Sequence, residues 1–161
     1  PRNGREIMNE RQQWNLLRTE LESLGRAAAS LQKSVAKCSR LTPSPRQSFE
    51  EEESLDALTS KFARCSDILT QKVLKTLVFI LREEAPTFVD RMHLCEKLGA
   101  IPSATSLIEI RDLRNTIAHE YAVDDLLELY ADVLKMCPQL VEAAKSAELF
   151  VEGRLSSLGK K

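Results

Sequence analysis

Glycine and long apolar runs are both scarce in this chain of 161 residues. Only five glycines are present, and runs of β-branched residues are few. Leu, Ala, Glu, Lys and Arg dominate instead, and these residue types favour helix. No apolar run approaches the roughly 20 residues that a helix needs to cross a bilayer. We therefore expect one all-α domain over residues 1–161 and no membrane span.

The cysteines have no metal-binding spacing, since no CxxC pair occurs. We therefore expect no zinc site, no other metal and no cofactor. Four cysteines are enough for two disulfides, but the lack of a signal peptide favours reduced thiols and a cytoplasmic protein. Buried small hydrophobic side chains are the interpretation we favour for all four. They are Cys38, Cys65, Cys95 and Cys137.

No excess of one charge sign is present. The formal net charge is −1, with 23 basic and 24 acidic residues. This balance excludes a globally basic nucleic-acid binder, although it leaves room for a local basic cleft.

A heptad stripe marks a first long helix over residues 9–37. Apolar residues follow one another there at alternating spacings of three and four, which places them on one helix face. The stripe has two interpretations, packing inside a bundle or a seam between two copies, and we favour the bundle. Its members are Trp14, Leu17, Leu21, Leu24, Ala28, Leu31 and Val35.

Residues 41–53 predict a mobile loop. Pro43 and Pro45 cannot continue a helix, and the acidic run after them is expected to be a solvated approach to the next helix. Ser54 is then the expected N-cap of a second long helix that extends to about Glu84.

Three further helices complete the pattern. The third begins at Pro86 and ends near Gly99, and the fourth begins at residues 102–103. The fifth is expected to be capped by Asp124 and to be kinked or split by Pro138. We expect a frayed tail over residues 153–161. Four to five helices with short connections describe an up-and-down bundle.

Residues 114–121, Arg-Asn-Thr-Ile-Ala-His-Glu-Tyr, concentrate the reactive chemistry. This stretch holds one of two histidines and one of two tyrosines. The guanidinium of Arg114 suits a phosphate, because it binds in bidentate fashion and stays charged. An imidazole such as that of His119 exchanges protons near neutral pH.

The spacing predicts a polar helix face beside Arg114. Arg111, Asn115 and His119 fall at steps of four, so we expect them on one side of the fourth helix. Such a face suits metal-independent cleavage of a phosphodiester. The attacking group is the ribose 2′-hydroxyl, so RNA is the expected substrate and DNA is inert.

Other polar residues admit plainer interpretations. Arg64 and Asp67 lie three apart on the second helix and could pair with one another, and we favour a surface or inter-helix ion pair. A supporting role beside Arg114 is the alternative for both residues. We expect His93 to be a surface or partly buried helix residue and Tyr130 to belong to the core.

The signature Arg114-x4-His119-x-Tyr121 resembles that of the HEPN superfamily, in which a polar residue follows the arginine. Its spacing is similar to the HepT-like branch, the toxin partners of minimal nucleotidyltransferases. The wider resemblance covers residues 54–121, including the segments 62–67 and 96–99.

The resemblance implies a HEPN-like helical homodimer whose two motifs share a cleft. It implies an endoribonuclease toxin with Arg114 and His119 as catalytic residues and Asn115 as the polar residue after the arginine. Tyr121 is then the hydroxyl that a cognate nucleotidyltransferase antitoxin adenylylates, which blocks RNA.

Two other functions remain open on the sequence. One is a non-catalytic subunit that binds a nucleotide or RNA beside a nucleotidyltransferase. The other is a structural helical adaptor, which the heptad stripe and the acidic balance favour.

Overall fold

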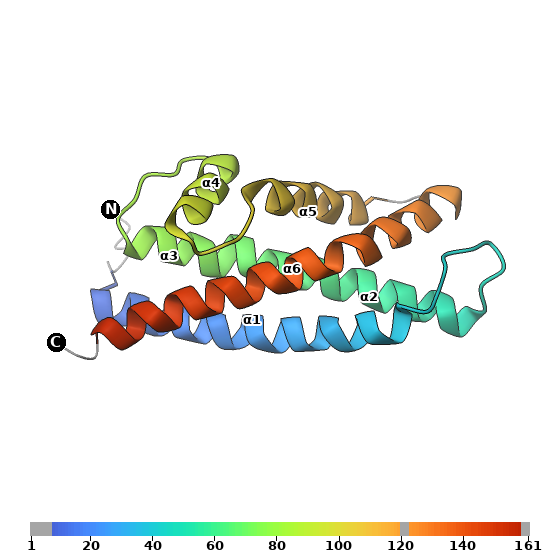
Figure 1. Ribbon diagram of the computed structural model, residues 1–161, viewed down its shortest axis with the longest axis horizontal. Helices are drawn as coiled ribbons and strands as arrows, with labels where there is room; N and C mark the ends of the chain where they lie inside the picture. Colours follow the sequence, from blue (N-terminus) through green and yellow to red (C-terminus); the bar gives the residue numbers. More distant parts are fainter. Residues whose placement is uncertain (1–7, 120–122, 159–161) are drawn as a thin grey trace, which may run out of the picture.

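A computed structural model describes residues 8–119 and 123–158 of the chain, and these residues form a helical bundle (Figure 1). The order is α1 (Glu10–Cys38), α2 (Phe49–Asp67), the π-helical segment η1 (Ile68–Val73), α3 (Leu74–Ile80), α4 (Phe88–Leu98), α5 (Ala104–Ile117) and α6 (Val123–Leu158). The described residues contain no strand. The predicted all-α bundle is therefore confirmed.

Four segments run in alternating directions along the bundle. They are α1, the continuous rod from α2 to α3, α5, and α6, with the short α4 between α3 and α5 (Figure 1). This is the up-and-down arrangement expected of helices joined by short connections.

The heptad stripe of α1 is buried inside the chain. Asn9 caps the helix, because its side chain accepts from the backbone N–H of Gln12 while the Gln12 side chain accepts from that of Asn9. Leu17, Leu24 and Leu31 are fully buried, and α1 packs on α2, η1 and α6. The stripe therefore serves the bundle, the interpretation that the sequence favoured over a dimer seam.

The second helix begins earlier than the sequence analysis predicted. Ser48 caps α2 in a reciprocal capping box with Glu51. Residues 49–53 are therefore helical, and the predicted loop over residues 41–53 ends at Ser48 instead. Ser54, the predicted cap, is buried inside α2 and donates to the carbonyl of Glu50. The acidic run occupies the first turn, where negative charge stabilises a helix.

A π-helical segment joins α2 to α3 without a break. The backbone N–H of Leu74 donates to the carbonyl of Leu69, five residues back, so this turn holds one more residue than an α-helical turn. The rod ends at Ile80 rather than at Glu84. Asp67, the last residue of α2, lies directly before the π segment.

The two short helices match the sequence predictions closely. Thr87 caps α4, and Gly99 ends it in the left-handed conformation with φ of 80°, which glycine adopts without steric cost. Ser103 caps α5, and the backbone N–H of Ala104 donates to the Glu96 carboxylate. These contacts tie the start of α5 to α4.

The last helix is longer than predicted. α6 starts at Val123, one residue before the predicted cap Asp124, and Pro138 lies inside it without splitting it. It continues to Leu158, so the predicted frayed tail from residue 153 is wrong at least that far. Tyr130 is buried as expected, and its hydroxyl hydrogen-bonds the carboxylate of Asp56 on α2.

The core runs the length of the bundle and takes in all four cysteines. Each is unpaired and buried, which confirms their interpretation as small hydrophobic side chains. Within residues 8–119 and 123–158, no helix is both long and apolar enough to cross a membrane.

The buried thiols make the folded chain less stable at alkaline pH. Burial raises the pKa of Cys65 and Cys137 from 9.0 to about 12 and that of Cys95 to about 11. Above pH 9 the unfolded chain releases these protons while the folded chain keeps them. The stabilisation is therefore complete below pH 9 and is lost as the pH rises toward 11–12.

We predict that Cys65→Ala flattens this alkaline loss of stability. Urea unfolding followed by circular dichroism at several pH values between about 8 and 10 measures it, and one thiol contributes at most about 1.4 kcal/mol per pH unit. Ser60→Ala, an exposed change on the same helix, keeps the wild-type slope. Equal slopes in both variants would contradict the prediction.

Candidate functional site

The arginine of the sequence signature is held by a carboxylate from another helix. Arg114 lies in the last turn of α5, and its Nε and Nη2 donate to Oδ1 and Oδ2 of Asp67, both at 2.7 Å. The two side chains are 35% and 40% exposed. This planar, bidentate geometry fixes the orientation of the guanidinium at the surface of the bundle.

The ion pair leaves Arg114 able to hold an anion. Its hydrogen bonds to Asp67, together with the carboxylate charge, raise the pKa of the guanidinium, so the side chain stays cationic. A guanidinium has five N–H donors, and Asp67 takes two of them. Three donors remain for a ligand, and partial exposure gives solvent and solutes access to them.

His119 lies just beyond the helix that carries Arg114. α5 ends at Ile117, and the backbone N–H groups of Ala118 and His119 donate to the carbonyls of Asn115 and Thr116 at 3.2 and 3.1 Å. Asn115 and His119 are exposed. The predicted helical face therefore reaches Asn115 but not His119, which follows the helix end in a bend.

Arg111 faces a different neighbour. Its guanidinium lies 4.2 Å from the centroid of the Phe88 ring on α4, and its Nη2 lies 3.4 Å from the adjacent Asp112. A cation over an aromatic face is stabilised by the ring quadrupole. Arg111 thus packs α5 against α4, and among the described residues no hydrogen bond or ion pair joins it to Arg114 or Asp67.

The predicted pair of Arg64 and Asp67 does not form. Asp67 binds Arg114 on α5 instead, across 47 positions of sequence. This is an inter-helix ion pair, one of the two forms that the sequence favoured, and it also places Asp67 beside Arg114. Arg64 is exposed and lines a pocket between α2 and α1.

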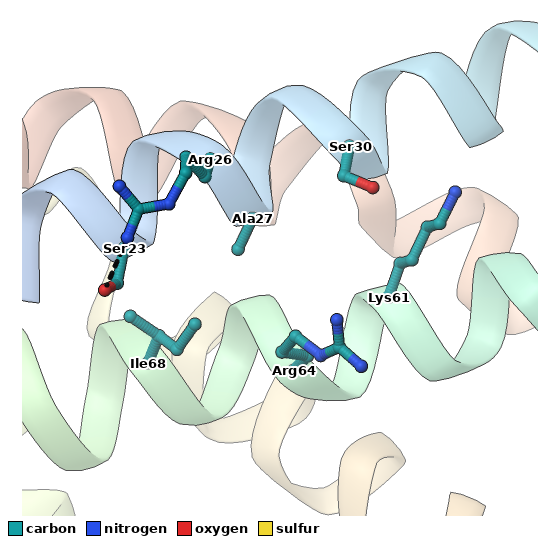
Figure 2. A pocket seen from close by; sticks show the side chains of 7 residues that line it. All are labelled: Ser23, Arg26, Ala27, Ser30, Lys61, Arg64 and Ile68. Carbon is teal, nitrogen blue, oxygen red and sulfur yellow. Dashed lines mark hydrogen bonds between the residues drawn. The ribbon is translucent and has the colours of Figure 1, made fainter.

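This pocket is basic and lies between α1 and α2 (Figure 2). Lys61 extends from α2 toward α1, and Arg64 lies over α2 with its guanidinium on the side of Lys61. Arg26 lies along α1 with its guanidinium against Ser23. Arg26 and Lys61 could not be recognised as one cationic cluster from the sequence, because only the packing of α1 against α2 brings them together. The spacing of three between Lys61 and Arg64 was the one available signal.

Two other residues stand where the sequence analysis expected them. His93 is exposed on α4, and Tyr130 belongs to the core. Tyr121, the predicted modification site, lies outside the described residues. Within the part of the chain that the structure describes, no group of three or more potential metal ligands occurs.

Comparison with known proteins gives no relative: no family model, no curated protein and no solved structure matches this chain.

We predict that Asp67→Asn releases Arg114 at little cost to the fold. The free energy of unfolding falls by less than about 1 kcal/mol, because the pair is more than one-third exposed and water screens it. The NMR signal of the Arg114 Nε–H moves and exchanges faster with solvent. Asp112→Asn, an exposed neighbour, leaves that signal in place; an unchanged signal in Asp67→Asn would refute the coupling.

Proposed function

We propose that the chain is a HEPN-like, metal-independent endoribonuclease in which Arg114 and His119 do the chemistry. The observation that supports this most is the anchoring of Arg114 by Asp67 at 2.7 Å with three N–H donors left over. An oriented, permanently charged guanidinium in the last turn of α5 and an exposed histidine two residues past that helix's end suit the cleavage of a phosphodiester.

In the proposed reaction the phosphate of RNA binds to the remaining N–H donors of Arg114. His119 takes the proton of the ribose 2′-hydroxyl, whose oxygen then attacks the adjacent phosphorus. The bond from phosphorus to the 5′-oxygen breaks, and that oxygen receives a proton. The products are a 2′,3′-cyclic phosphate and a 5′-hydroxyl. Arg114 stabilises the added charge on the phosphate oxygens in the transition state.

The reaction needs one group that accepts the proton of the 2′-hydroxyl and a second group that donates a proton to the 5′-oxygen. We propose that the His119 of a second copy of the chain is the second group. In a homodimer with the ends of α5 facing one another, one His119 acts as base and the other as acid. Asn115 in the last turn of α5 and His119 just after the end of that helix are both exposed. Their exposure supports this arrangement, because both side chains are open to a partner.

We predict that the purified protein cuts single-stranded RNA in EDTA and leaves DNA of the same sequence intact. His119→Ala slows cleavage by roughly 10²–10⁴-fold because it removes proton transfer. Arg114→Ala slows it by roughly 10²–10³-fold because it removes stabilisation of the transition state. Gel analysis of a labelled RNA measures both rates.

Matched controls separate the site from the remaining surface. His93→Ala and Arg18→Ala remove an exposed histidine and an exposed arginine from α4 and α1, and both variants keep the wild-type rate. Equal cleavage by wild type and His119→Ala would reject the proposal, since a contaminating nuclease would then explain the activity.

We further propose that the nuclease is a cytoplasmic toxin, silenced by a cognate nucleotidyltransferase antitoxin that adenylylates Tyr121. Tyr121 stands two positions after His119 in the sequence, and the negative charge of added AMP phosphates would repel the phosphates of RNA. The expected result of co-expression with the adjacently encoded nucleotidyltransferase is a mass increase of whole AMP units and a loss of RNA cleavage.

Tyr121→Phe abolishes the mass increase on this account, because the acceptor hydroxyl is absent. Tyr130→Phe, the matched control at the other tyrosine, keeps the increase because that hydroxyl is buried against Asp56. A mass increase that persists in Tyr121→Phe would place the modification elsewhere.

A second candidate function is a non-catalytic subunit that holds RNA or a nucleotide beside a nucleotidyltransferase. The basic pocket between α1 and α2 favours it, because binding needs cations and no proton transfer. RNA affinity that depends on Arg114 without any cleavage would support this function. The adaptor hypothesis has lost its main support, since the heptad stripe is covered by the chain's own helices.

A further inference from the structure

The pocket between α1 and α2 gathers positive charge without any carboxylate in its lining. It holds about 270 Å³, and its walls carry three cationic side chains, two serine hydroxyls and two apolar side chains. The lining residues are Ser23, Arg26, Ala27, Ser30, Lys61, Arg64 and Ile68. In the close view, α6 lies behind these helices, so the pocket opens on the face of the bundle away from α6 (Figure 2).

Hydroxyl groups hold two of the cations in place. The Nζ of Lys61 donates to Ser34 Oγ at 2.7 Å, and Nη2 of Arg26 donates to Ser23 Oγ at 3.3 Å. A hydroxyl orients a cation without neutralising it, and no carboxylate among the lining residues offsets the repulsion between the three like charges. An anion in the pocket would offset it and would receive several N–H donors.

We infer that this pocket binds a backbone phosphate of the RNA strand whose scissile phosphate lies at Arg114, which rests on the proposed function. Arg64 links the two places, because it is three residues before Asp67 and thus on a neighbouring position of the same helix surface. One strand passing from α5 over α2 meets Arg114 first and then the cations between α2 and α1.

The lining fits a phosphate rather than a complete nucleotide. It offers no aromatic ring for a base to stack on and no side-chain amide to read a base edge. Its volume of about 270 Å³ is below the roughly 300–1,000 Å³ of pockets that enclose drug-sized ligands. A pocket of this kind binds backbone without reading sequence.

The test measures RNA binding without cleavage. A short fluorescein-labelled single-stranded RNA is titrated with His119→Ala protein, with and without Arg26→Ala and Arg64→Ala, and anisotropy is read from about 50 to 200 mM KCl. We expect the added pair of substitutions to weaken binding roughly fivefold at low salt. The slope of log affinity against log salt should fall by about 0.7, the value for one phosphate contact on a single strand.

A control pair matches the change of charge. Lys97→Ala with Lys135→Ala removes two exposed lysines from α4 and α6, and it should leave the affinity and the salt slope close to those of the His119→Ala protein. Circular dichroism melting curves show that each variant is folded. Equal weakening by both pairs overturns the inference, because net charge alone would then account for binding.

The remaining outcomes test the phosphate pocket and the nuclease proposal separately. RNA binding that depends on Arg26 and Arg64 in a protein that cuts no RNA supports the pocket and refutes the nuclease. Displacement of the RNA by AMP at concentrations near the RNA dissociation constant overturns the inference, because the pocket would then belong to a mononucleotide.

Discussion

The ion pair between Arg114 and Asp67 is the interaction on which the candidate site depends. Asp67 ends α2 directly before the π-helical segment η1, and its carboxylate holds the guanidinium of Arg114 on α5. The wider turn inserts one residue relative to an α-helix. Phe62 and Cys65 before this turn and Leu77 after it are all buried, so the rod keeps facing the core on both sides of the π segment.

The polar side chains of α2 contact two different helices, α5 and α1. Asp67 reaches α5 and holds Arg114, while Lys61 and Arg64 line the basic pocket between α2 and α1. Acidic and basic side chains three positions apart thus serve different helices instead of pairing with one another. The carboxylate orients one arginine, and the cations beside it stay available to an anion.

Local patterns in the sequence predict most of the helices but only part of the candidate site. Helical periodicity marked every long helix, because each must bury one face. Ser48 stands three residues before Glu51, which is the spacing of a capping box, whereas Ser54 has an alanine at that position, so the sequence held a signal for the true cap of α2 that the loop interpretation passed over. The π segment leaves no signature in that periodicity. The bond from Arg114 to Asp67 spans 47 positions, and only packing of the helices creates it.

The central claim is that Asp67 acts on RNA cleavage through Arg114, and a double-mutant cycle tests it most directly. Cleavage rates are measured for wild type, Asp67→Asn, Arg114→Ala and the double variant. The account predicts that Asp67→Asn slows cleavage in the wild-type background and has no further effect once Arg114 is alanine. Independent effects that multiply in the double variant, or a wild-type rate in Asp67→Asn, would contradict it.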